Sequence, residues 1–142
     1  MADDPIYRKD LKALALTRLR EAKVLLANKE FSGSYYLAGY VVECALKAVI
    51  AKRTQRHEFP DKGRAVTSWT HNLEKLLGAA ELQASLQAES KSKPRFSSNW
   101  DVVKDWSEAS RYKDWNQREA EDLIRAVSES KHGVLAWLRH HW

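Results

Sequence analysis

Apolar residues recur every three or four positions along most of this chain, which is the spacing of amphipathic helices rather than of strands. Between residues 6 and 28 charged residues fill most of the gaps in one such stripe, so this segment is predicted to be a helix with one buried face. The stripe consists of Leu11, Leu14, Ala15, Leu19, Ala22, Leu25 and Leu26. Ser32-Gly33-Ser34 interrupts the pattern, and either serine can cap the next helix.

The following segment, from about residue 34 to 53, is apolar on most of its circumference. Its apolar positions are Leu37, Val41, Val42, Cys44, Leu46, Ala48, Val49 and Ile50. A helix that is apolar nearly all round is surrounded by other helices. We therefore expect this segment to be the central helix of a bundle.

The second half of the chain shows shorter patterns. The basic segment up to about residue 68 contains proline and glycine and is predicted to be a loop. A short helix is expected at 71–77, because three leucines lie on one face there. The polar run 89–98 contains Pro94 and is predicted to be a mobile loop.

Two asparagines indicate helix starts towards the carboxy terminus. Asn99 can cap a short helix, and Asn116 with Glu119 has the spacing of a capping box. An apolar stripe then continues over residues 120–138, which predicts one last long helix with Gly133 as its weak point. No strand-like alternation occurs, so the chain is predicted to be all-α, with four long or moderate helices and one or two additional short helices.

Length and composition favour a single domain over residues 1–142, since 44% of the residues are hydrophobic and 30% are charged. The polar start MADDPIYRKD does not resemble a signal peptide, and no run of about 18 uncharged apolar residues occurs. The one cysteine, Cys44, has no disulfide partner. These features predict a cytoplasmic protein without a membrane span.

The net charge of +5 is concentrated in two segments. Residues 52–64 and residues 91–95 each carry a net +3, which leaves −1 for the rest of the chain. Such segments attract phosphate groups, or they are simply solvated loops.

Tyr36, Tyr40, Glu43 and Lys47 lie along one side of the predicted central helix. Desolvating both charges would cost several kcal/mol per ion unless further hydrogen bonds complete their shells. The two tyrosines and Arg111 are candidate partners, and we predict that Glu43 is held by Lys47 or Arg111 in a satisfied polar network. The stripe is either structural, including an interface, or part of a ligand site.

Three blocks of the sequence, FSGSYYLAGYVVECALKAVIA, HNLEKLL and WSEASRY, resemble the HEPN family (higher eukaryotes and prokaryotes nucleotide-binding domain). In that family a tyrosine-rich helix ends in a Glu-x-x-Leu-Lys-Ala block, a His-x-Leu-x-x-Leu block follows, and an Arg-Tyr pair precedes the last long helix. The resemblance runs from about residue 8 to 138. It implies an up-and-down four-helix bundle, frequent dimerisation, and roles in RNA cleavage, nucleotide binding or toxin–antitoxin systems.

From this resemblance we expect a homodimeric binding module, non-catalytic and without a cofactor or metal. It would act in a nucleotide- or RNA-related system of the toxin–antitoxin or defence type, with a nucleotidyltransferase-like partner. The predicted ligand- or partner-binding residues are Tyr40, Glu43, Lys47, His71, Arg111 and Tyr112.

The alternative is a metal-independent endoribonuclease, because catalytic HEPN members carry an Arg followed, after four to six residues, by a His. Arg would stabilise phosphate charge and His would act as an acid or base. Arg64 with His71 and Arg125 with His132 have this spacing. Alanine follows both arginines, where a polar residue is usual, so no catalytic residue is predicted. His71 is interpreted instead as a capping or packing residue at a helix start.

Other candidate chemistry is weaker. His140 and His141 are adjacent and would diverge by about 100° on a helix, so they are not expected to chelate one metal. The six tryptophans are able to stack on bases, but Trp106 beside Val102 and Val103 is typical of a core.

Overall fold

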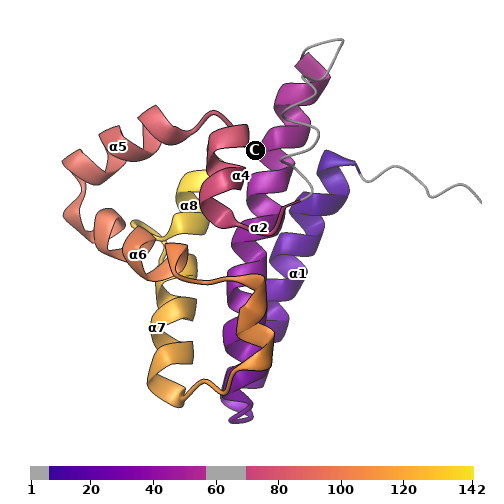
Figure 1. Cartoon of the computed structure of the whole chain (residues 1–142), viewed down its shortest axis with the longest axis vertical. Coiled ribbons are helices and arrows are strands. Elements are labelled where there is room, and N and C mark those ends of the chain that lie inside the picture. The colour runs from indigo at the N-terminus through magenta and orange to yellow at the C-terminus, as the bar shows by residue number, and fades with distance from the viewer. Residues whose placement is uncertain (1–6, 57–69) are drawn as a thin grey trace, which may run out of the picture.

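α2 (Phe31–Arg56) forms the centre of the molecule, as its hydrophobicity predicts. The computed structural model describes residues 7–56 and 70–142. In Figure 1 α2 lies between α1 (Arg8–Ala27) and the helices of the carboxy-terminal half. Most of α2 is buried, because helices cover it on several sides.

The carboxy-terminal half adds six shorter elements. They are α4 (Leu73–Ala79), α5 (Gln83–Ser92), α6 (Pro94–Lys104), the 3₁₀ helix η1 (Glu108–Tyr112), α7 (Gln117–Ser128) and α8 (Val134–Arg139). Every regular element within the described residues is a helix, so the predicted all-α bundle is confirmed. Most of the expected basic loop, residues 57–69, lies outside the described residues.

α1 and α2 form an antiparallel hairpin with a tight, small-residue interface. Ala15 and Ala22 of α1 are fully buried. α2 begins at Phe31, and neither serine that follows is its cap. Ser34 Oγ instead donates a hydrogen bond to the Ala22 carbonyl at 2.8 Å, and Ser32 Oγ accepts one from the Trp115 amide at 2.9 Å.

The predicted loop at 89–98 is wrong, because α5 continues to Ser92 and α6 begins at Pro94. Proline is favourable in a first helical turn, where its missing N–H has no intrahelical partner to lose. Asn99 is therefore inside α6 and does not cap a helix. Its side chain donates to the His132 carbonyl at 2.9 Å.

The predicted last helix is divided into α7 and α8. Its start is as expected, since the Asn116 side chain accepts from the Glu119 amide at 2.8 Å. The break occurs at Gly133, where a Cβ atom would lie 2.3 Å from the Glu129 carbonyl oxygen. Gly133 is thus required by a close backbone approach between the two helices.

A second close approach joins the segment before η1 to α2. Trp106, 2% exposed, packs its indole directly on Gly39, where a Cβ atom would lie 2.2 Å from the ring. The expectation that Trp106 belongs to the core is confirmed. This contact places η1 beside the central helix.

α2 also has the length and composition of a membrane-spanning helix over Phe31–Thr54, the one such segment in the described part of the chain. However, 72% of that window is buried inside the molecule. Burial by neighbouring helices accounts for its hydrophobicity.

Gly39→Ala is expected to lower the free energy of unfolding by about 1–3 kcal/mol, because the new methyl group would displace the Trp106 ring. The matched control is Gly33→Ala in the same helix. There the nearest atom is the flexible end of Leu25 at 3.3 Å, and alanine favours the helix by about 1 kcal/mol. Urea denaturation measures both, and equal stability of the two variants would contradict the assigned contact.

Candidate functional site

Glu43 is the one charged side chain that the described part of the chain fully buries, with 2% exposed. Lys47, one turn further along α2, places Nζ 3.2 Å from Glu43 Oε2. His71 places Nδ1 2.9 Å from Oε1. A positive charge and an imidazole N–H thus compensate a carboxylate whose desolvation would otherwise cost several kcal/mol. Of the two basic residues predicted to hold Glu43, Lys47 is the one that does so.

His71 bridges the central helix and η1. It is not the cap of α4, because the Asn72 side chain accepts from the Lys75 amide at 2.9 Å. The His71 side chain is 42% exposed, and its Nε2 lies 3.6 Å from Glu108 Oε2. With Nδ1 donating to Glu43, the imidazole is oriented by a buried carboxylate and presents its other nitrogen to Glu108.

Arg111 and Tyr112 lie at the outer end of this network. Arg111 Nη1 is 3.3 Å from Glu108 Oε1, and Nη2 donates to the Tyr112 hydroxyl at 2.9 Å. The guanidinium also lies over the Tyr112 ring, 4.8 Å from its centroid. Arg111 therefore does not bond to Glu43, and the prediction that it is a partner of Glu43 is wrong. It continues the line of charges from Glu108 to the surface.

These contacts define the Glu43 network, which joins α2, the residues before α4, and η1. Its members are Lys47, Glu43, His71, Glu108, Arg111 and Tyr112. Exposure rises from 2% at Glu43 to 77% at Tyr112. The network thus has a fixed, buried end and an accessible end that holds a cation and an aromatic ring.

Tyr40 and Cys44 of α2 lie next to the buried end. Burial raises the pKa of Tyr40 to about 12, assisted by the neighbouring Cys44 and Glu43. Burial and the Glu43 charge raise the pKa of Cys44 to about 11. Tyr36 stacks on Tyr40 with a ring-centroid distance of 6.3 Å. The phenol of Tyr40 and the thiol of Cys44 therefore stay protonated near neutral pH.

The two Arg–His matches do not form a pair within the described residues. Arg64 lies outside them, so its match with His71 has no described geometry. Arg125 is 65% exposed and pairs with Asp122 at 3.4 Å. In the described chain no bond connects Arg125 to His132, whose Nδ1 is buried without a partner.

Glu108 is the network member that sequence reasoning missed. Its i,i+3 spacing to Arg111 is a visible signal for an ion pair on one helical turn. No spacing rule connects it to His71, because the two residues belong to segments that meet only in the folded chain. Among residues 7–56 and 70–142, no group of three or more His, Cys, Asp or Glu side chains is placed to hold a metal ion.

The fold and the site define an all-α module whose central helix carries a buried polar network. The family model described as HEPN domain matches residues 9–140, and the chain therefore belongs to the HEPN family. This membership indicates a helical module with a nucleotide- or RNA-related role. Comparisons with curated proteins and with solved structures gave no significant match.

Alkaline pH is expected to destabilise the fold through Cys44. Its ordinary pKa of 9.0 is raised to about 11 by burial, so the unfolded chain loses the thiol proton first. The stability that Cys44 contributes is complete below pH 9 and is lost as the pH rises to about 11, by roughly 1.4 kcal/mol per pH unit.

Denaturation of the wild type and of Cys44→Ala across this pH range measures the effect. The difference between their free energies of unfolding should shrink by about 2–3 kcal/mol from the acidic to the alkaline end. A difference that does not change with pH would show that the thiol titrates normally.

Proposed function

We propose that this HEPN protein is a cytoplasmic, non-catalytic binding module that recognises a nucleotide or single-stranded RNA in a toxin–antitoxin or defence-type system. The observation that carries the proposal is the exposed Arg111–Tyr112 pair at the end of the Glu43 network. Tyr112 is 77% exposed, although large aromatic side chains are usually buried more deeply. Its ring is nevertheless held by the Arg111 guanidinium.

An exposed ring and a fixed guanidinium are complementary to nucleotide chemistry. Bases stack on aromatic rings largely irrespective of sequence, and arginine binds phosphate through paired N–H donors. Glu108 holds Arg111 in place at 3.3 Å, and His71 lies next to Glu108. Glu108 therefore positions Arg111, and Arg111 and Tyr112 meet the ligand.

A metal-independent ribonuclease is the second candidate, and the orientation of His71 favours it. An imidazole whose Nδ1 is held by a buried carboxylate is fixed for acid–base chemistry at Nε2. Arg111 would be the nearby cation, since both residues contact Glu108. This arrangement would use an Arg–His pair that is not adjacent in sequence.

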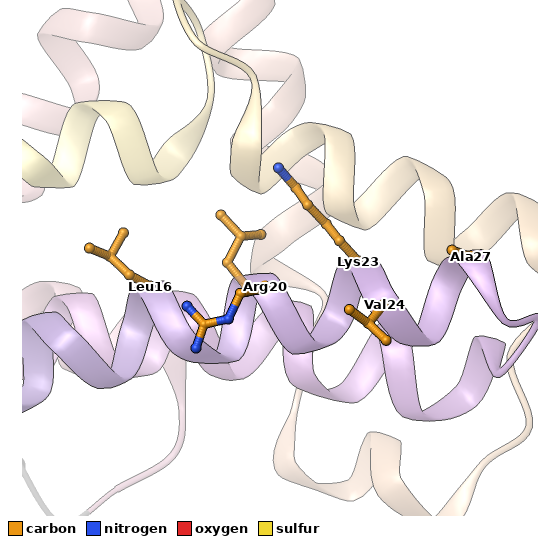
Figure 2. Close-up of a pocket in the computed structure, with 6 residues that line it drawn as sticks. Leu16, Arg20, Lys23, Val24 and Ala27 are labelled. Atoms are coloured by element: carbon orange, nitrogen blue, oxygen red, sulfur yellow. The ribbon is translucent and has the colours of Figure 1, made fainter.

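A partner protein is expected to dock on the outer face of α1. A groove of about 450 Å³ runs along this helix, and Figure 2 shows the side chains that line it. Leu16 is 40% exposed there and Val24 is 56% exposed. Arg20 and Lys23 border it and have no carboxylate partner within the described residues. An apolar, basic groove is complementary to an acidic surface, which we assign to the nucleotidyltransferase-like partner.

The same charges argue against α1 as the face for a homodimer. A two-fold contact would bring the patch against itself, and Arg20 and Lys23 would meet like charges. The proposed homodimer therefore uses another face.

Arg111→Ala/Tyr112→Ala is expected to weaken binding of a single-stranded oligoribonucleotide about tenfold, which corresponds to the loss of one stacked base. The matched control is Arg118→Ala/Tyr7→Ala, which removes an exposed Arg and an exposed Tyr elsewhere. Fluorescence anisotropy measures the affinities. Equal affinity of both double variants would contradict the assigned site.

The same RNA, incubated with each protein in EDTA, separates the two candidate functions. The binding module predicts intact RNA. Cleavage that disappears in His71→Ala would instead establish the ribonuclease.

Sedimentation velocity tests the proposed assembly. The wild type is expected to sediment as a dimer, and Val24→Arg should leave the dimer intact, because α1 does not form its interface. A monomeric wild type would contradict the homodimer. Dissociation of the dimer by Val24→Arg would show that α1 is the dimer face rather than the partner face.

A further inference from the structure

A second cleft lies where α5, α6 and α8 meet the link between α7 and α8. Its volume is about 350 Å³, which is within the range of small-molecule sites. Its lining combines two segments that are far apart in the sequence. They are the basic run 91–95 and the adjacent His140 and His141 near the carboxy terminus. We propose that this cleft binds the phosphate group of a small phosphate monoester.

Two lysines face a single carboxylate in the cleft. Lys93 and Lys131 line it, together with the imidazoles of His140 and His141. The one acidic residue in its lining is Glu89, and Lys93 pairs with that carboxylate at 2.7 Å. Lys131 makes no ion pair within the described residues, so its ammonium group is available to an anion.

Two buried aromatic rings line the cleft, and one of them contacts His141. Phe96 is 1% exposed and Trp137 is 6% exposed, and their ring centroids are 5.2 Å apart. The His141 and Trp137 rings pack in a T-shaped arrangement with centroids 5.3 Å apart, and His141 Nε2 lies 3.4 Å from Ser85 Oγ. The imidazole and the serine hydroxyl are therefore positioned beside the two lysines before a ligand arrives.

The surroundings of His141 disfavour its protonated form. Burial lowers its pKa, and the positive charges of Arg53, His140 and Lys52 lower it further, while Glu89 opposes them weakly. Lys93 and Lys131 face the same cleft. A dianion bound there would offset these charges, so binding should raise the pKa of His141, and protonation of His141 should strengthen binding.

The test is an NMR titration of the whole chain with ribose 5-phosphate, with ribose as the control that lacks phosphate. Ribose 5-phosphate should shift the Trp137 indole and His141 signals saturably, and ribose should not. Lys93→Ala/Lys131→Ala should lower the affinity about tenfold or more. The matched control Lys104→Ala/Lys113→Ala removes two lysines outside the cleft and should bind like the wild type.

Three results would overturn the proposal: no saturable shift, the same shifts with ribose, or equal loss of affinity in both lysine variants. Because the probe has no base, and Arg111→Ala/Tyr112→Ala should bind it normally, this test is independent of RNA binding.

The role of His141 is tested by measuring the affinity for sulfate as a function of pH. Because sulfate keeps a constant charge between pH 5 and 8, any change in affinity comes from the protein. In a His140→Gln background, the affinity should rise severalfold as the pH falls through this range, and the further change His141→Gln should abolish the rise. A pH-independent affinity in the wild type would contradict the participation of His141.

Discussion

A single buried carboxylate organises this molecule. Glu43 lies in the middle of a helix that is packed on almost every side, where an uncompensated charge would cost several kcal/mol. Lys47 compensates it from within α2. The second partner has to come from another segment, and His71 fills that role. The need to satisfy one carboxylate thus fixes the start of α4 against α2.

Packing places the remaining part of the network. Trp106 lies on the bare backbone of Gly39, which holds the segment leading into η1 against the central helix. Glu108 then reaches His71, and Arg111 reaches Glu108. Core packing and buried electrostatics therefore converge on the same surface, where Tyr112 is exposed. This convergence explains why Arg111 and Tyr112 have defined positions although they lie at the surface.

Local patterns predicted the features that depend on neighbouring residues. Periodicity identified α2 as the central helix, and the i,i+4 spacing identified the Lys47–Glu43 pair. The link from His71 to Glu43 and Glu108 depends on three segments meeting in space, which no local pattern encodes. Pro94 and Gly133 were misinterpreted for a related reason. Proline is compatible with both a loop and a first helical turn, and the close approach at Gly133 exists only in the folded chain.

The most direct test of this account is a double-mutant cycle on the free energy of unfolding between Glu43→Gln and His71→Ala. If His71 compensates the buried charge, the two effects should be coupled by at least about 1 kcal/mol, as for residues in one network. His140→Ala, combined with Glu43→Gln, supplies the uncoupled control. Effects of Glu43→Gln and His71→Ala that add within about 0.5 kcal/mol would contradict the central role of this contact.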